Sequence, residues 1–243
     1  MIRPVALLAC LALPVLSSPA AADAIRIGTE SGYPPYMSLD AAGRLQGYDK
    51  DLGDLICTMI EADCTWTDAA FDSLLPDLAA GQYDLVIAAL AASPERQLTV
   101  DFSAPYMTGG ENIGVFAGLT PGQPLDSARI GVQAGTIHAQ HLIDTGRNVT
   151  LFPSNDAALD ALMRREVDLV FTSDLVLRDA FERRYPALRR VAEEAVQAWD
   201  TAVAVRKGAG TLLDRVNLAI ETLRVNGMLD QLEDKWFVDG QTL

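Results

Sequence analysis

The chain has 243 residues with 33 acidic and 19 basic side chains, and its formal net charge is −14 at pH 7. This surplus of negative charge disfavours nucleic-acid binding, because the phosphate backbone would be repelled. The charges are scattered and form no acidic tail, so we interpret them as a solvated surface with some bias toward cationic partners.

The N-terminus has the layout of a secretory signal peptide. An arginine precedes an apolar stretch from Val5 to Leu16, and a small-residue exit ends at Ala22. The apolar stretch is too short for a membrane span and is broken by Pro14, and no later segment is long enough to cross a bilayer. A lipoprotein acylated at Cys10 is disfavoured, because hardly any apolar core precedes that cysteine. We therefore predict a signal peptide over residues 1–22 and a mature chain in the periplasm.

Strand-like and helix-like runs then alternate along the chain. In the first half the strand-like runs are "IRIGTE", "CTWTDA" and "DLVIAAL", and the helix-like runs are "KDLGDLICTMIE" and "FDSLLPDLAAG". The same order returns in "ARIGVQAGT", "HAQHLID", "NVTLFP", "DAALDALMRRE" and "DLVFTSD". Strands that are apolar on both faces and are separated by helices predict an α/β fold with a parallel sheet.

The two remaining cysteines, Cys57 and Cys64, form an even pair in an exported chain, for which a disulfide is the expected state. Two buried thiols are the alternative. The two residues cannot both lie on one regular helix and bridge easily. We therefore place Cys57 on a helix and Cys64 at the start of the following strand.

An internal echo favours two similar lobes. "LPDLAAGQYDLVIAAL" and "LDALMRREVDLVFTSD" share leucines and then Asp-Leu-Val entering an apolar strand, with Asp84 and Asp168 as equivalent points. The apolar pattern of any βαβ unit can produce one such match. The prediction of two similar lobes therefore rests mainly on the repeated alternation of strands and helices. The helical tail after residue 210, with a break at Asn226-Gly227, is expected to pack back on the first lobe. The predicted lobes are 23–110 with 199–243, and 111–198.

In open parallel sheets, ligands collect beyond the carboxyl ends of the strands. "SPERQ" follows one such end and predicts a helix start, with Ser93 as N-cap and Pro94 at the first helical position. A cation such as Arg96 is unfavourable in the first turn of a helix, where the helix dipole is positive. Its presence there is explained if the guanidinium and the free backbone N–H groups together bind a carboxylate. The alternative is an ordinary surface arginine. Asp174, at the matching end in the second half, could hold an ammonium group or cap a helix.

The chain as a whole resembles a known family, the periplasmic amino-acid-binding proteins of ABC importers, especially the lysine/arginine/ornithine and histidine type. The resemblance covers essentially the whole mature chain and rests on "IRIGTESGYPPY", "GYDKDLGDLIC", the cysteine spacing, "FDSLLPDLAAGQYDLVIAAL", "SPERQ", "DFSAPY", "GVQAGT" and "KWF". It implies a type II periplasmic-binding-protein fold, in which two α/β lobes joined by two hinge segments close on a ligand in the cleft between them.

The resemblance also implies roles for individual residues. Arg96 would grip the ligand α-carboxylate, and Asp174 would hold its α-amino group. The other implied contacts are an aromatic pair that sandwiches the ligand side chain, acidic residues near its far end, and the walls of the cleft: Tyr33, Phe71, Glu30, Asp49, Ala89, Ala91 and Thr136. From the residues alone, Tyr33 also fits a turn aromatic, Phe71 a core residue and Asp49 a helix N-terminal charge.

The sequence departs from the family pattern around the expected amino-group site. Ala91 stands where the family usually has Ser or Thr, Ala89 where Ser or Gly is frequent, and Ile137 where a second Thr is frequent. A hydrogen bond to a charged group contributes about 1.5–3 kcal/mol. Loss of this hydrogen bond would weaken binding of a plain amino acid roughly tenfold to hundredfold. Alternatively, the alanines make room for a bulkier ligand or admit a ligand without a free α-ammonium group.

His138 and His141 are three apart at the start of an expected helix. A His-x-x-His pair can ligate a metal, but no third ligand is evident nearby, so we expect an exposed helix face and no metal or other cofactor.

The leading hypothesis is a non-catalytic solute-binding protein that delivers an amino acid or derivative to an ABC-transporter permease. Glu30 and Asp49 favour a cationic side chain, as in arginine, lysine, ornithine, histidine or an opine built on one of them. One alternative is a periplasmic dehydratase-like enzyme on the same fold, with Glu30 and Asp174 as acid or base; another is a ligand-binding sensor protein. By resemblance, we expect a monomer.

Overall fold

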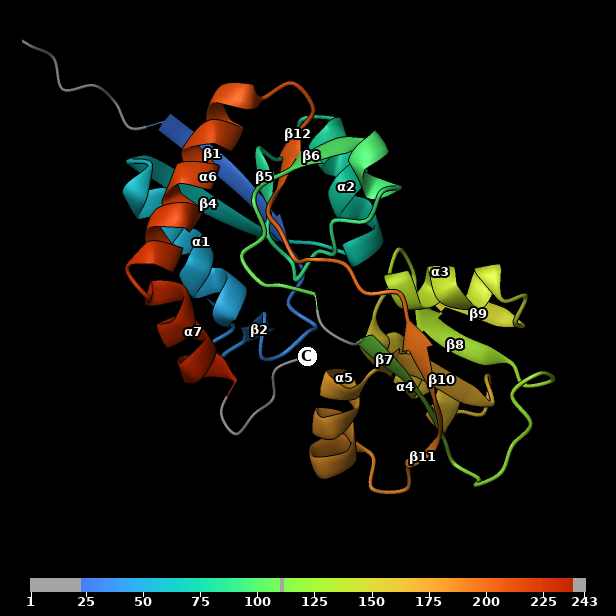
Figure 1. The fold of residues 1–243 in the computed structure, drawn as a ribbon. Helices are drawn as coiled ribbons and strands as arrows, with labels where there is room; N and C mark the ends of the chain where they lie inside the picture. Colours follow the sequence, from blue (N-terminus) through green and yellow to red (C-terminus); the bar gives the residue numbers. More distant parts are fainter. Residues whose placement is uncertain (1–22, 110–111, 238–243) are drawn as a thin grey trace, which may run out of the picture.

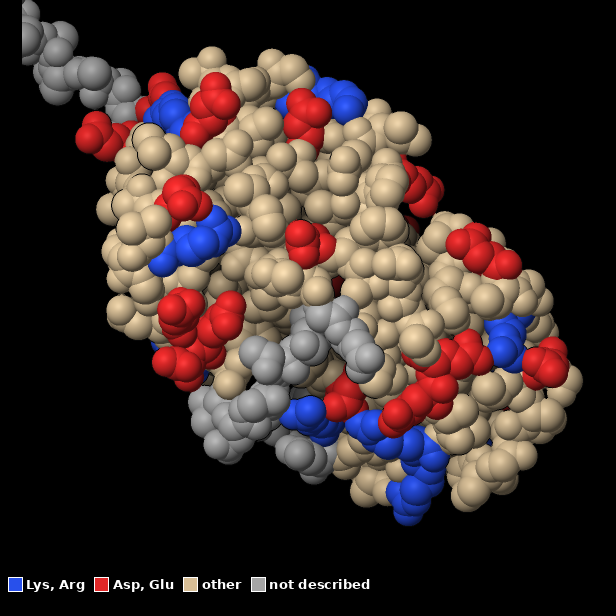
Figure 2. Space-filling view, viewed as in Figure 1, with Lys and Arg blue, Asp and Glu red and all other residues tan. Residues whose placement is uncertain are grey.

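The computed structural model describes residues 23–109 and 112–237, so the predicted signal peptide lies outside the described residues. It consists of two α/β lobes that lie side by side and are linked by two crossing segments (Figure 1). Within the described ranges, no helix combines the length and apolarity that a membrane span requires. On the face shown in Figure 2, acidic and basic side chains are interspersed over both lobes.

A five-stranded sheet with the order β4-β1-β5-β12-β6 forms the centre of the first lobe. β1 pairs in parallel with β4 and β5, whereas β12 is antiparallel to β5 and β6. The strands are β1 (Asp23–Thr29), β4 (Ala62–Asp68), β5 (Leu85–Val86), β6 (Val100–Phe102) and β12 (Ala204–Arg206), with a small hairpin of β2 (Ser38–Leu39) and β3 (Leu45–Gln46). The helices are α1 (Tyr48–Met59), α2 (Phe71–Ala79), the 3-10 turn η1 (Arg96–Leu98), α6 (Gly210–Val225) and α7 (Met228–Trp236).

The second lobe repeats this topology, with the order β11-β7-β10-β8-β9. β8 pairs in parallel with β9 and β10, and β7 is antiparallel to β10 and β11. The strands are β7 (Asn112–Gly118), β8 (Ile130–Gln133), β9 (Val149–Phe152), β10 (Leu169–Ser173) and β11 (Arg189–Val196). The helices are α3 (Ile137–Asp144), α4 (Asn155–Met163), α5 (Asp174–Asp179) and the π-helical η2 (Ala180–Arg184).

The predicted α/β class is confirmed, but the sheets are mixed and not purely parallel. β7 and β12 each enter their sheet directly after the chain has crossed from the other lobe, and each runs against the parallel strands. The two crossing segments run alongside one another. Their backbones are joined by hydrogen bonds from Tyr106 N to Thr201 O (2.9 Å) and from Thr201 N to Met107 O (2.9 Å).

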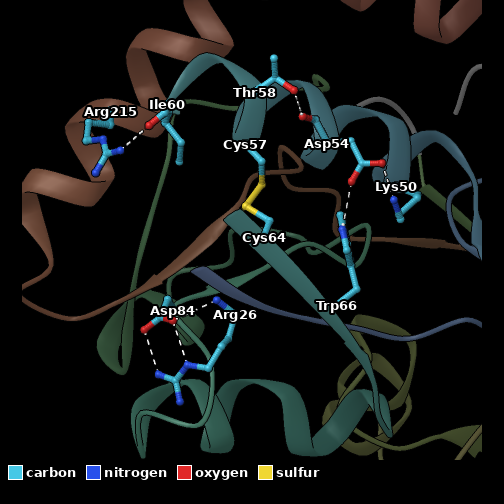
Figure 3. Close-up of a disulfide and its surroundings, with 10 residues drawn as sticks. All are labelled: Arg26, Lys50, Asp54, Cys57, Thr58, Ile60, Cys64, Trp66, Asp84 and Arg215. Carbon is cyan, nitrogen blue, oxygen red and sulfur yellow. Dashed lines mark hydrogen bonds and ion pairs between the residues drawn. A yellow bond between two sulfur atoms is a disulfide. The ribbon is translucent and has the colours of Figure 1, made fainter. Parts of the chain in front are cut away.

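The internal echo corresponds to the same ion pair in both lobes. Arg26 of β1 donates from its backbone N and its guanidinium to the Asp84 carboxylate, with three distances of 3.0 Å (Figure 3). Arg129, just before β8, makes the matching three bonds to Asp168 at 2.9, 3.0 and 2.9 Å. Each pair joins two neighbouring parallel strands of its sheet, β1 to β5 and β8 to β10, at the point where the chain enters β5 or β10.

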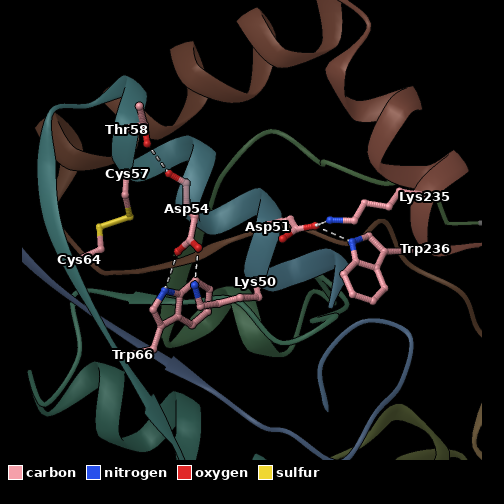
Figure 4. Close-up of polar contacts among 9 residues, drawn as sticks. All are labelled: Lys50, Asp51, Asp54, Cys57, Thr58, Cys64, Trp66, Lys235 and Trp236. Atoms are coloured by element: carbon pink, nitrogen blue, oxygen red, sulfur yellow. Dashed lines mark hydrogen bonds and ion pairs between the residues drawn. A yellow bond between two sulfur atoms is a disulfide. The ribbon is translucent and has the colours of Figure 1, made fainter. Parts of the chain in front are cut away.

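The C-terminal helices pack on the first lobe, as predicted. Ile220 of α6 belongs to the same buried cluster as Ile27 of β1 and Ile56 of α1. The helical tail breaks at Gly227, whose φ of +74° is a conformation that glycine adopts without strain. Lys235 Nζ and Trp236 Nε1 both donate to the Asp51 carboxylate of α1, so the end of α7 is fastened to α1 (Figure 4).

The predicted disulfide joins Cys57 of α1 to Cys64 of β4, with a Cα–Cα distance of 6.1 Å (Figure 3). The bridge therefore links the helix to the neighbouring strand, as the sequence predicts.

The helix expected to start at Ser93 is only the three-residue 3-10 turn η1. Gln97 N donates to Ser93 O at 3.1 Å, but β6 begins at Val100, so the chain has no room for a regular helix.

Candidate ligand-binding site

A cavity lies between the two lobes, where the strands of both sheets end. Seven of the nine predicted contact residues line it: Glu30, Tyr33, Phe71, Ala89, Ala91, Arg96 and Thr136. The second lobe and the returning crossing segment contribute further walls that include Gln133, Ile137, His138, Asn155, Phe171, Thr172, Ser173 and Trp199. The sequence-based expectation of a cleft at the carboxyl ends of the strands agrees with this arrangement.

Arg96 reaches across the cavity mouth from the first lobe to the second. Its Nη1 donates to the carbonyl of Ala91 at 2.8 Å, and its Nη2 donates to the carbonyl of Gly135 at 2.9 Å. The guanidinium carbon lies 5.5 Å from the centroid of the Phe71 ring, in a cation–π arrangement. Burial lowers the pKa of Arg96 to about 10, so the group remains a cation at neutral pH.

Arg96 has no carboxylate partner among the described residues, because both of its side-chain hydrogen bonds go to neutral carbonyls. Arginine recognises carboxylates through its planar fork of N–H donors. The geometry therefore provides a partly buried cation that faces the cavity and is suited to an anionic ligand group.

Glu30 provides an acidic group in the cavity wall. It follows β1 directly, is only 8% exposed and accepts a hydrogen bond from Gln133 Nε2 at 2.8 Å. Gln133 Oε1 in turn accepts from Asn155 Nδ2 at 2.6 Å, and Asn155 Oδ1 accepts from Thr172 Oγ1 at 2.7 Å. Desolvation raises the pKa of Glu30 to about 7. This line of amides holds the carboxylate in place across the two lobes.

Aromatic side chains form much of the remaining wall. Tyr33 stacks on Tyr36 with ring centroids 5.3 Å apart, and it shares a side-chain hydrogen bond with Ser173 of the second lobe. Together with Phe71 and Trp199, it supplies flat apolar surfaces for an alkyl or planar ligand chain.

His138 lines the cavity, whereas the sequence predicted that it would lie on an exposed helix face. Its Nε2 atom is buried and has no hydrogen-bond partner, and its ring packs edge-on against Phe171 at 5.6 Å. Burial lowers the pKa of His138 to about 4, so the imidazole is neutral at physiological pH. His141 instead contacts Glu194 Oε2 at 3.0 Å. Among the described residues, no group of three or more His, Cys, Asp or Glu is placed to hold a metal ion.

Asp49 does not line the cavity, contrary to its expected position near the ligand side chain. It is fully buried in the first turn of α1, where its carboxylate accepts from Ala89 N at 2.5 Å and from Tyr106 Oη at 2.9 Å. Ala89 has a φ of +46°, which is unusual for a residue with a side chain. Asp49 therefore supports the corner of the cavity wall and belongs to the scaffold of the site.

Asp174 is also absent from the cavity wall, although its neighbour Ser173 is part of it. It is the first residue of α5, and one carboxylate oxygen pairs with Arg178 on the next helical turn at 3.0 Å. The other oxygen contacts the guanidinium of Arg190 on β11. The expected ammonium holder thus has one oxygen paired with Arg178, while its other oxygen, Oδ1, is buried and has no hydrogen-bond partner among the described residues.

Sequence reasoning did not identify Asn155, Thr172, Trp199 or the hydrogen-bonding role of Gln133. Thr172 stands at the strand end that the pattern located, and Gln133 is part of the motif "GVQAGT". Asn155 and Trp199 come from parts of the chain that carried no such signal.

Comparisons with known proteins agree with this architecture. An L-arginine-binding protein of Pseudomonas aeruginosa is 31% identical over 251 residues, with 97% of this chain and 96% of that protein covered. A Silicibacter pomeroyi periplasmic protein of the His/Glu/Gln/Arg/opine-binding family, solved with lysine, has a TM-score of 0.81 and 26% identity, and the match covers 90% of this chain and 99% of the other.

A third similar structure is an ancestral amino-acid-binding protein described as a precursor of cyclohexadienyl dehydratase. Its TM-score is 0.72 at 26% identity, and the match covers 88% of this chain and 95% of the other. The family model of bacterial extracellular solute-binding proteins, family 3, matches residues 25–239. With its two lobes, inter-lobe cavity and full-length match, this chain belongs to the bacterial extracellular solute-binding proteins, family 3.

Proposed function

We propose that this protein captures an amino acid or amino-acid derivative with a cationic side chain in the periplasm and delivers it to the permease of an ABC transporter. The observation that carries the proposal is the Arg96 guanidinium, which lines the inter-lobe cavity and, within the described ranges, is hydrogen-bonded only to two carbonyls. A ligand carboxylate would supply its missing counter-charge.

The rest of the cavity fits the other end of such a ligand. Glu30 offers a carboxyl group in the same cavity wall, and Tyr33, Phe71 and Trp199 add aromatic surface to it. Known binders of arginine and lysine with the same architecture support this reading. Binding energy would draw the two lobes together, and the permease would recognise the closed form.

The proposal is tested by isothermal titration calorimetry of the exported protein with arginine, lysine, ornithine, histidine and opines. Arg96→Ala should abolish binding of every ligand that the wild type binds, while the circular dichroism spectrum stays unchanged. Arg44→Ala is the matched control, because Arg44 is an exposed arginine of the same lobe that pairs with Asp40. Retained affinity in Arg96→Ala would overturn the carboxylate assignment.

A dehydratase-like activity is the second candidate, and the similarity to a dehydratase precursor favours it. The pKa of Glu30, raised to about 7 by burial, lies in the range of a general acid or base. Incubation with small cyclic carboxylic acids, followed by product analysis, decides this question. Turnover that Glu30→Gln removes would favour an enzyme.

A further inference from the structure

We infer that Gln133, Asn155 and Thr172 of the second lobe form a polarised hydrogen-bond relay, which makes closure of the lobes selective for a ligand that places a cation beside Glu30. This inference rests on the proposed function and names positioning residues that would enforce its preference for a cationic side chain. The juxtaposition that carries it is a buried carboxyl group of the first lobe at the end of a row of buried amides of the second lobe.

The relay runs from β10 to Glu30 without a gap. Thr172 Oγ1 donates to Asn155 Oδ1 at 2.7 Å, and Asn155 Nδ2 donates to Gln133 Oε1 at 2.6 Å. Gln133 Nε2 then donates to Glu30 Oε1 at 2.8 Å. Each of these residues is no more than 8% exposed. Because an unmade hydrogen bond is costly in such a place, each group is oriented by its neighbours in the relay.

The order of donors and acceptors fits an ionised Glu30. An amide donates only through its nitrogen and accepts only through its oxygen, and a carboxylate only accepts. Gln133 presents Nε2 to Glu30, since its oxygen accepts from Asn155, whose own oxygen accepts from Thr172. A protonated Glu30 would need an acceptor for its own proton, and both amides would have to turn around to offer Gln133 Oε1. The relay therefore favours the ionised form.

The electrostatic surroundings of Glu30 favour the neutral form. Burial is the largest cause of its raised pKa of about 7, and the neighbouring carboxylates of Asp68 and Asp156 act in the same direction. Arg96, the cation that lines the same cavity, donates to two backbone carbonyls instead. The other titratable side chains of this wall are uncharged at neutral pH because burial raises the pKa of the tyrosines and lowers that of the histidine: Tyr33, Tyr36 and His138. A ligand cation would supply the charge that keeps Glu30 ionised.

The relay also connects the charge of the ligand to closure. Glu30 follows β1 of the first lobe, whereas Gln133 is the last residue of β8 in the second lobe, so their hydrogen bond forms only when the lobes are together. A hydrogen bond to an ionised group is stronger than one between neutral groups. A ligand that keeps Glu30 ionised therefore strengthens a bond across the cleft, and an uncharged ligand of the same shape does not.

The inference is tested by calorimetry at pH 6 with two matched pairs of ligands: L-arginine with L-citrulline, and L-lysine with L-norleucine. Each pair differs in the side-chain cation. The complex with the uncharged member should hold about one proton more than the complex with the cation, because Glu30 is protonated only in the former. Titration in buffers of different ionisation enthalpy measures this difference. Equal proton counts in the two complexes would overturn the inference.

Gln133→Met tests the relay at its contact with Glu30. In the pair whose cationic member binds more tightly, the ratio of the two dissociation constants should fall by about tenfold, the difference between a charged and a neutral hydrogen bond. Because the readout is a ratio, any general loss of affinity cancels. An unchanged ratio in the folded variant would overturn the inference and leave the proposed function standing, whereas wild-type binding of none of arginine, lysine and ornithine would refute both.

Thr172 tests the relay at its other end, without a change beside Glu30. Thr172→Val keeps the shape of the side chain but removes the hydroxyl that orients Asn155, so the ratio should fall, by less than in Gln133→Met. Thr172→Ser is the matched control, because it keeps the hydroxyl and should retain the wild-type ratio. Equal ratios in the Val and Ser variants would overturn the relay, since they would show that the hydroxyl of Thr172 has no part in the preference.

Discussion

Replacing Asp49 by Asn should change the pH dependence of stability without removing ligand binding. Asp49 is fully buried, and desolvation raises the pKa of its carboxyl group to about 7 even though Ala89 N and Tyr106 Oη donate to it. In the unfolded chain the same group titrates near 3.9. Between pH 5 and 7, Asp49 is therefore largely protonated in the folded state and ionised in the unfolded state.

The sign of the effect follows from this difference. The contribution of Asp49 is present in full below its unfolded pKa and is lost as pH rises through the folded pKa, at a rate of at most about 1.4 kcal/mol per pH unit. Glu30, whose pKa is also raised to about 7, acts in the same direction and remains in the variant. The difference between wild type and Asp49→Asn therefore isolates Asp49.

The amide also changes the absolute stability. An Asn side chain has one acceptor oxygen, which can serve Ala89 N, while the Tyr106 hydroxyl must change from donor to acceptor of the amide NH2; this rearrangement of a buried hydrogen bond costs about 1 kcal/mol. Removal of a desolvated carboxylate offsets part of this cost at pH 7, where the carboxyl group is partly ionised. We therefore expect a clear loss of stability at pH 5 and a smaller loss at pH 7.

The assay is urea denaturation at pH 5, 6 and 7 for the wild type, Asp49→Asn and Asp63→Asn, an exposed acidic residue of the same lobe. Calorimetry with the preferred ligand follows at pH 7. Identical pH slopes in all three proteins would refute the buried, protonated Asp49, and loss of binding without loss of folding would place Asp49 in direct contact with the ligand.

Three further outcomes are expected. Reduction of the Cys57–Cys64 bridge should lower the free energy of unfolding by about 2–3 kcal/mol, the chain-entropy value for so short a loop, with unchanged ligand preference; thiol titration and thermal melts measure this. Gly135→Ala should weaken ligand binding, because Gly135 has a φ of +73° and an added Cβ would lie 2.9 Å from the Asp72 Cα of the facing lobe; an unchanged dissociation constant would contradict this contact. Ala91→Ser should strengthen binding of L-arginine by about tenfold to a hundredfold if a missing hydroxyl limits affinity, and calorimetry showing no gain would indicate a cavity shaped for another class of ligand.

Much of the architecture could be predicted because it is encoded in local patterns. Apolar strands alternating with helices specify the α/β class, and the Asn226-Gly227 break and the cysteine pair are local signals. Arg96 could be located because it follows a strand end, where ligand sites of parallel sheets gather. These features depend on periodicity and short-range spacing, which a single sequence displays.

The hydrogen bonds within the site could not be predicted in the same way. The Glu30–Gln133 bond joins residues 103 positions apart, and the Ala89–Asp49 bond joins residues 40 apart. Whether Asp49 faces a ligand or the backbone of Ala89 depends on how α1 sits against β5. No local pattern contains that information.

Asp174 shows why a correctly located strand end does not determine what each side chain does. The sequence match around Asp84 and Asp168 identifies β5 and β10 as equivalent strands. In both lobes, residues that follow these two positions line the cavity. Thr172 and Ser173 end β10 and face the ligand space, but Asp174 is already the first residue of α5, within reach of the next helical turn and of β11. An arginine at i+4 on that helix, Arg178, pairs with one carboxylate oxygen, and the other oxygen, Oδ1, is buried without a hydrogen-bond partner among the described residues. A strand end therefore indicates which residues come near the cavity, whereas the element that follows the strand decides which partners each side chain meets.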